Sequence, residues 1–233
     1  MIEVKELSKA YGEQVVLNIP GLTIHKGESF GLVGNNGAGK TTMFRCVLDL
    51  IRPTGGCVFS NGEDVAKKES WKKYTGSYLD DGFLIDFLTP EEYFRFVADV
   101  YGLSDGDLQQ FYSDFEDFFN NEIIGKKKLI RDLSSGNRQK IGIASALMPK
   151  PQVLVLDEPF NSLDPSTQIR LKNLLNRLQE QNDITMLISS HDLNHITEVC
   201  NRIVILHEGT IVHDLQRTED TLKVLEEYFS VKK

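Results

Sequence analysis

A glycine-rich segment at residues 34–42 has the residue types and spacing that cradle a phosphate group. Its glycines let successive backbone N–H groups point inward, where a Cβ would intrude on the anion. Lys40 would reach the β- and γ-phosphates of a nucleotide, and the Thr41 hydroxyl would ligate Mg²⁺. The segment therefore predicts a nucleoside triphosphate site. The residues expected to contact the nucleotide there are Gly34, Asn35, Asn36, Gly37, Ala38, Gly39, Lys40, Thr41 and Thr42.

Two adjacent carboxylates, Asp157 and Glu158, follow an apolar run at residues 153–156. Carboxylates at the end of a buried strand are costly unless they serve a cation or a reaction. Beside a phosphate loop, this pattern favours Asp157 as part of the Mg²⁺ shell and Glu158 as the group that polarises the attacking water. The alternative is a solvated Asp-Glu turn.

A third segment, residues 133–139, places small residues before a helix predicted over residues 140–147. Small polar residues are good helix caps, which is a sufficient explanation for the segment by itself. The free N–H groups of a helix start also bind anions. The chain would then have two phosphate-binding helix ends, and the second one needs an explanation.

The elements around these residues indicate an α/β protein. Apolar runs at residues 30–33 and 184–189 predict further strands, and residues 43–48 predict a helix directly after the phosphate loop. Asp164 and Pro165 begin another helix by cap and first-turn proline. Residues 203–206 and 210–212 predict a hairpin, and an amphipathic helix follows. The alternation of strands and helices predicts a largely parallel sheet with helices on both faces.

A compositionally distinct helical region begins near residue 80. Thr89, Pro90 and Glu92 have the types and spacing of a capping box with proline at the first helical position. Eight of the thirteen phenylalanines lie between residues 83 and 119. Three of them, Phe111, Phe115 and Phe118, share one helical face. The aromatics favour a lobe core over a ligand site, with docking of a partner by surplus aromatics as the alternative.

Composition excludes several classes of protein. The 233 residues are 40% apolar and carry a net charge of −8, which opposes general binding to nucleic acid, so no nucleic acid partner is expected. No run approaches the roughly 18–20 apolar residues that span a bilayer. The first five residues resemble a strand rather than a signal peptide. Three distant cysteines argue for a reducing cytosol and against a zinc site or disulfide framework.

Together these segments resemble the nucleotide-binding subunit of ATP-binding cassette (ABC) transporters, over essentially the full length. Residues 34–42 resemble the Walker A loop, residues 153–158 Walker B with its catalytic glutamate, and residues 133–139 the signature sequence. Residues 161–164 resemble the D-loop, and His191 the switch histidine. Tyr11 stands where an adenine-stacking aromatic is expected. Six elements in order are far more specific than any one alone.

The resemblance implies a fold and domain organisation. It implies an α/β P-loop NTPase core with a mostly parallel sheet, an N-terminal antiparallel β subdomain and an inserted α-helical lobe. Residues 1–233 would form one nucleotide-binding domain. Approximately 1–79 and 150–233 would make the core and β subdomain, and approximately 80–149 the lobe with the lid loop and signature.

The resemblance also implies a head-to-tail dimer that sandwiches two ATP molecules with Mg²⁺. Each site would join the Walker motifs of one chain to the signature of the other, so that Ser134 and the Gly136 amide contact the γ-phosphate in trans. His191 would help to position the water and Glu158, and Asp164 would couple the two sites. The signature residues expected at the nucleotide are Ser134, Ser135, Gly136 and Asn137, of which Ser135 and Asn137 replace a usual Gly and Gln.

The lid loop departs further from the family pattern. Alignment of residues 75–80 with this loop places Asp80 where the family usually has a Gln that touches Mg²⁺ or the water. A carboxylate can still accept from metal-bound water. Asp81 is an alternative in a shifted register. Some members of the drug and antimicrobial-peptide export branch also have an acid here, which favours export.

The leading interpretation is therefore the ATPase subunit of a membrane transporter. Its partners would be separate transmembrane permease subunits and a second nucleotide-binding subunit, identical or not. It would lie peripherally on the cytoplasmic face of the cell membrane. The alternative is a soluble ABC ATPase in a non-transport assembly, such as cluster assembly. A metabolic P-loop kinase would not explain the signature, D-loop and switch histidine together.

Overall fold

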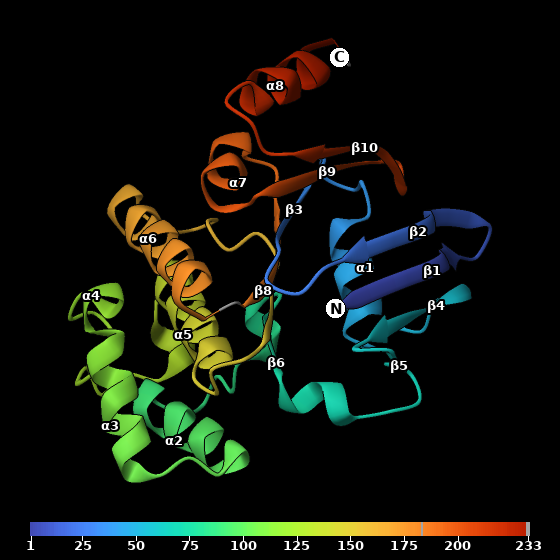
Figure 1. Cartoon of the computed structure of the whole chain (residues 1–233). Helices are drawn as coiled ribbons and strands as arrows, with labels where there is room; N and C mark the ends of the chain where they lie inside the picture. The colour runs from blue at the N-terminus through green and yellow to red at the C-terminus, as the bar shows by residue number, and fades with distance from the viewer. Residues whose placement is uncertain (183, 232–233) are drawn as a thin grey trace.

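The computed structural model describes residues 1–182 and 184–231, which form two β-sheets and a set of helices (Figure 1). The strands are β1 (Ile2–Tyr11), β2 (Gln14–Ile24), β3 (Ser29–Val33), β4 (Gly55–Ser60), β5 (Glu63–Asp64), β6 (Thr75–Tyr78), β7 (Val153–Leu156), β8 (Thr185–Ser190), β9 (Arg202–His207) and β10 (Thr210–Gln216). The α-helices are α1 (Lys40–Val47), α2 (Pro90–Tyr101), α3 (Asp105–Asp114), α4 (Glu116–Phe119), α5 (Ser135–Leu147), α6 (Pro165–Asn182), α7 (Leu193–Val199) and α8 (Thr221–Val231). Three short 3₁₀ helices are η1 (Ser70–Lys73), η2 (Asp81–Phe83) and η3 (Ile130–Asp132).

The larger sheet has the strand order β10-β9-β3-β8-β7-β6. Its inner pairs are all parallel, and only the β9–β10 hairpin is antiparallel. The smaller sheet, of order β2-β1-β4-β5, is antiparallel. The α/β fold with a mostly parallel sheet and an N-terminal antiparallel sheet is thus confirmed. Because β8 lies between β3 and β7, the loops that follow these three strands leave the same edge side by side.

The parallel sheet separates two hydrophobic cores. Alternate residues of β7 face opposite sides, so Leu154 and Leu156 join one core while Val153 and Val155 join the other. The first core is shared with α5, α6, α7 and the helical lobe, and the second with α1 and the antiparallel sheet. Figure 1 shows these groups on opposite sides of β3. Buried on both faces, the central strands are apolar throughout.

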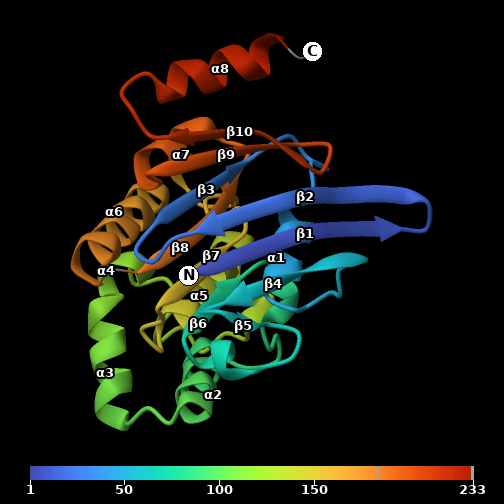
Figure 2. The same ribbon diagram turned by 45° about the vertical axis from the view of Figure 1, so that its right-hand side comes forward.

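The helical lobe contains α2, α3 and α4, at the end of the molecule opposite α8 (Figures 1 and 2). The capping box is confirmed: the Thr89 hydroxyl accepts from Glu92 N, and the Glu92 carboxylate accepts from Thr89 N. The expectation of one helical face across the phenylalanines is wrong, because α3 ends at Asp114 and α4 begins at Glu116.

Aromatic side chains on both sides of the break at Phe115 enter one core. Phe115, Phe118 and Phe119 are all buried. The rings of Phe115 and Phe119 lie 5.8 Å apart, and those of Phe94 and Phe111 5.0 Å apart. The break between α3 and α4 therefore lies within the aromatic core of the lobe.

Most predicted boundaries agree closely with the structure. Residues 153–156 form β7, and the predicted strand at 184–189 forms one residue later. The helix expected over 140–147 begins earlier, at Ser135. The division of the chain near residues 80 and 149 stays a prediction, and residues 183 and 232–233 of the predicted domain lie outside the described residues.

Candidate functional site

The glycine-rich loop joins the end of β3 to the start of α1. Lys40, the first residue of α1, is only 6% exposed. Its ammonium donates to the Gly34 carbonyl at 2.7 Å and lies 3.2 Å from a carboxylate oxygen of Glu158. The Lys40 side chain therefore curls back into the loop and links the end of β3 to the end of β7.

Asp157 lies beside the loop, buried at the end of β7. It accepts from the Thr41 hydroxyl at 2.5 Å and from the Ser189 hydroxyl. Burial raises the pKa of Asp157, against these hydrogen bonds, which stabilise its charged form. A buried carboxylate beside a hydroxyl fits Mg²⁺, which takes oxygen ligands and usually keeps waters and phosphate oxygens. The expected pair of metal ligands, Thr41 and Asp157, is thus in direct contact.

Glu158 and His191 form the second half of this cluster. His191 donates its backbone N–H to a Glu158 carboxylate oxygen at 3.2 Å, and its Nδ1 lies 2.9 Å from the same oxygen. Glu158 has φ of 49°, a left-handed conformation uncommon for a residue with a Cβ. Such strain gathers at functional sites. The carboxylate of Glu158 is therefore held between Lys40 and His191.

Ser189 is a site residue that the sequence interpretation missed. Its hydroxyl donates to Asp157 and accepts from the Glu158 backbone N–H at 2.9 Å. Gln139 was missed as well, and its amide donates to the Glu158 carbonyl at 3.2 Å. A signal was available for Ser189, because a polar residue in a fully buried strand requires a partner.

The signature segment forms the N-terminus of α5. The Ser134 hydroxyl caps this helix by accepting from Asn137 N at 3.2 Å. A Cβ at Gly136 would overlap the Ser162 carbonyl, so this residue lies tightly against the D-loop. Among residues 1–182 and 184–231, no hydrogen bond joins the segment 133–137 to the loop 34–42. Within the described residues, the two predicted phosphate-binding helix ends are therefore not hydrogen-bonded to each other.

Asp164 is hydrogen-bonded within the first turn of α6. It caps α6 by accepting from the backbone and hydroxyl groups of Ser166 and Thr167. These hydrogen bonds, the Ser166 hydroxyl first, hold the pKa of Asp164 far below its usual range. The predicted coupling of two sites by Asp164 is not tested by these contacts and stays a prediction.

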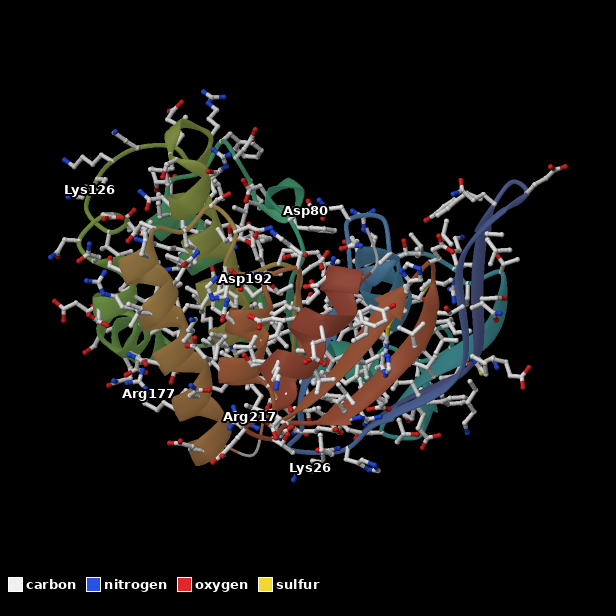
Figure 3. All side chains as sticks on the ribbon, turned by 90° about the horizontal axis from the view of Figure 1, so that it is seen from above. Lys26, Asp80, Lys126, Arg177, Asp192 and Arg217 are labelled. Atoms are coloured by element: carbon white, nitrogen blue, oxygen red, sulfur yellow. The ribbon has the colours of Figure 1, made fainter. Side chains whose placement is uncertain are left out.

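Tyr11 and Asp80 are the remaining expected site residues, and both are open to solvent. Tyr11 ends β1 and is 54% exposed, with the Lys9 ammonium 5.0 Å from its ring centroid. Asp80 follows β6, accepts from Gly82 N at 2.8 Å and lies 3.3 Å from the Arg45 guanidinium. Figure 3 shows Asp80 near the edge of the molecule opposite Lys26, which precedes β3. The stacking and metal roles of these residues stay predictions.

The similarity of this chain to known proteins agrees with the geometry. A family model described as "ABC transporter" matches residues 17–161. The chain is 34% identical to the bacitracin transport ATP-binding protein BcrA of Enterococcus faecalis, over 94% of this chain and 70% of that protein. It is 29% identical to the lantibiotic transport ATP-binding protein SrtF of Streptococcus pyogenes, over 99% of this chain and 96% of that protein.

Solved structures agree as well. A structure titled "Structure of ATP binding subunit of ABC transporter" superimposes with a TM-score of 0.86 at 28% identity, covering 100% of both chains. The dimeric bacterial ABC transporter cassette MJ0796 gives 0.83 at 25% identity, over 94% of this chain and 99% of that one. The protein belongs to the ABC transporter family, in which it is an ATP-binding and ATP-hydrolysing subunit.

Proposed function

We propose that this ATPase powers the export of antimicrobial peptides through separate membrane-spanning subunits. Two relatives, named for bacitracin transport and lantibiotic transport, support this substrate class. In the described part of the chain, no helix is both long enough and apolar enough to cross a membrane. The proposal places the chain on the cytoplasmic face of the membrane as a peripheral subunit.

The observation that carries the ATPase mechanism is the contact of Glu158 with both Lys40 and His191. A bound triphosphate would offer Lys40 anionic oxygen acceptors, to which an ammonium binds more strongly than to the neutral Gly34 carbonyl. The Glu158 carboxylate, released from Lys40 but still held by His191, would then accept a hydrogen bond from the attacking water. The cluster thus orients the base for γ-phosphate cleavage.

Mg²⁺, held by Thr41 and Asp157 in this proposal, would neutralise charge on the β- and γ-phosphates. Asp157 is suited to this role because its carboxylate is buried, and a bound cation would offset the free-energy cost of a buried negative charge. The Ser189 hydroxyl keeps Asp157 and Glu158 in fixed relative positions. Each of these residues acts by position and charge rather than by covalent chemistry.

A complete site would need a second chain. In this proposal, the N-terminus of α5, which Ser134 caps, would offer backbone N–H groups to the γ-phosphate of a nucleotide held by the other chain. In the proposed head-to-tail dimer, Ser134 and Gly136 of one chain would close on the nucleotide of the other. ATP would then act as the clamp between subunits.

The proposed docking surface for the membrane partner is an exposed apolar area on α2 and the lid loop. Phe96, Val100 and Tyr101 of α2 are exposed, as is Phe87 ahead of it. Tyr101 also lines a hollow of about 290 Å³ with residues of η1, β6 and the turn that follows α1. Exposed apolar and aromatic side chains on one helix are typical of protein interaction sites.

The ATPase proposal is tested by Glu158→Gln, which keeps the shape of the side chain but removes the base. We expect this variant to bind ATP, to lose nearly all hydrolysis and to accumulate as an ATP-dependent dimer in size-exclusion chromatography with light scattering. Glu158→Gln combined with Lys40→Ala is the matched control and should stay monomeric. A Glu158→Gln chain that stays monomeric at saturating ATP and Mg²⁺ would contradict the clamp.

The transport proposal is tested in the native cell. Deletion of the chain should sensitise cells to bacitracin or to lantibiotics, and only the unmodified chain, not Lys40→Ala, should restore resistance. The chain should also copurify with a multi-span membrane protein. Unchanged resistance together with no membrane partner would instead favour a soluble ABC ATPase.

A further inference from the structure

Asp81, the first residue of η2, turns inward from the lid loop to the signature helix. Its carboxylate accepts from the Arg138 guanidinium at 2.7 Å and from the Tyr78 hydroxyl at 2.5 Å. Asp80, its neighbour, accepts hydrogen bonds from Arg45 and Gly82 N instead. The two adjacent carboxylates therefore have different environments. Asp81, the alternative to Asp80 as the metal-contacting residue of the lid loop, is instead hydrogen-bonded to Tyr78 and Arg138.

The contacts of Asp81 continue into the backbone of the signature. A second nitrogen of Arg138 donates to the Leu133 carbonyl at 2.7 Å, directly before the Ser134 cap. The path from Asp81 through Arg138 thus ends at the backbone that positions the start of α5. Because the guanidinium is planar and rigid, its two hydrogen bonds fix the position of Asp81 relative to the Leu133 carbonyl.

Tyr78 supplies a second contact to the same helix face. A Cβ at Gly142 would overlap the Tyr78 ring, so the ring lies directly on α5. Arg138 and Gly142 are four residues apart and therefore share one face of the helix. Burial, followed by the hydrogen bond to Asp81, raises the pKa of Tyr78 well above its usual range, so the phenol stays protonated and donates.

The segment that follows the lid loop, residues 81–88, exposes two aromatic rings. Phe83, at the end of η2, is 53% exposed, and Phe87 is 66% exposed. A partner that presses on these rings would move η2, and Asp81 would carry that movement to Arg138. The loop therefore has an outward contact surface and an inward ionic contact within a few residues.

We propose that Asp81 is a positioning residue that joins the lid loop to the signature helix through Tyr78 and Arg138. Through this joint, displacement of the loop by the membrane partner sets the position of Ser134 and Gly136 against the nucleotide of the other chain. Asp81 acts on dimer closure and not on the nucleotide bound by its own chain. This inference rests on the proposed ATP-driven dimer.

The test uses a double-mutant cycle in the Glu158→Gln background. We expect Asp81→Asn to weaken ATP-dependent dimerisation about tenfold, equal to about 1.4 kcal/mol, while ATP affinity of the monomer changes less than twofold. Arg138→Gln should give a similar loss, and the two changes together should cost no more than either alone. Asp81→Glu should restore part of the dimerisation.

The matched control is Arg95→Gln, which breaks an ion pair with Asp105 elsewhere in the lobe and should leave dimerisation unchanged. Tyr78→Phe, which keeps the ring on Gly142 but removes the hydroxyl, supplies a milder variant if Asp81→Asn unfolds, and should weaken dimerisation about threefold.

The outcomes separate this inference from the proposed function. A Glu158→Gln parent that fails to dimerise contradicts the clamp itself. If the Glu158→Gln parent dimerises, and the Asp81→Asn and Tyr78→Phe variants dimerise with the same affinity as this parent, only the positioning role is overturned. Fully additive losses for Asp81→Asn and Arg138→Gln, or a parallel loss of ATP affinity, would overturn it as well.

Discussion

Gly39, the residue before the P-loop lysine, lies against the antiparallel sheet in a conformation that only glycine adopts easily. Its φ is 105°, and an added Cβ would lie 2.8 Å from the Val16 carbonyl oxygen and 3.0 Å from the Leu17 side chain. Gly37, two residues earlier, also has a positive φ, of 82°, but an added Cβ there would meet nothing within 4 Å. A Cβ at Gly37 would therefore meet only backbone strain, whereas a Cβ at Gly39 would meet backbone strain and close packing together.

Gly39→Ala should destabilise the protein through both effects. A residue with a Cβ in this region costs about 1–3 kcal/mol, and forcing a methyl group against packed backbone adds about 1–3 kcal/mol. The sum, about 4 kcal/mol, should lower Tm by on the order of 10 °C for a chain of this length. Gly37→Ala should lose only the first contribution, about 2 kcal/mol.

Urea unfolding without nucleotide, followed by circular dichroism, measures both variants. The loss of flexibility in the unfolded chain is the same for both glycine-to-alanine changes and cancels in the comparison. Equal losses of unfolding free energy, or a larger loss for Gly37→Ala, would refute the close packing of the loop against β2.

Four further substitutions act at the proposed metal-binding carboxylate, in the lobe core, on the exposed face of α2 and in the lid loop. Asp157→Asn should abolish Mg²⁺-dependent hydrolysis yet stabilise the protein at pH 7, because burial raises the pKa of Asp157 and the ionised form is costly above that pKa. In unfolding measurements, the gain in unfolding free energy over the unmodified protein should shrink as the pH falls through the raised pKa. A gain that does not depend on pH would contradict this reasoning. Phe94→Ala empties a fully buried site between aromatic rings and should lower the unfolding free energy by about 3–5 kcal/mol. Phe96→Ala, on the exposed side of the same helix, should leave stability unchanged but weaken copurification with the membrane partner, and comparable unfolding losses for the two would show that the lobe core is misassigned. Asp80→Asn should change coupled turnover with the membrane partner more than ATP affinity, and a large loss in an ATP titration would mean that this carboxylate acts at the nucleotide.

Residues close together in the sequence were enough to predict several local structures. The helix start at Thr89 and Pro90, the cap at Asp164, and strand β7 all depend on neighbours within about four positions, where capping and apolar runs act. The phosphate loop is predictable for the same reason, because its glycines and Lys40 lie within one short segment. The sequence by itself therefore determined the motifs and the family.

Only the tertiary structure decided how these segments meet. The strand order β3-β8-β7 places Ser189 between Asp157 and Glu158, although the serine is more than thirty residues away in the chain. Asp80 and Asp81 have different partners as well, because the turn at η2 directs the Asp80 carboxylate outward and the Asp81 carboxylate to α5. Neighbours in a parallel sheet are distant in sequence, so local patterns carry no information about them. The chain determined which groups do the chemistry, and the packing of the sheet and helices decided which of them touch.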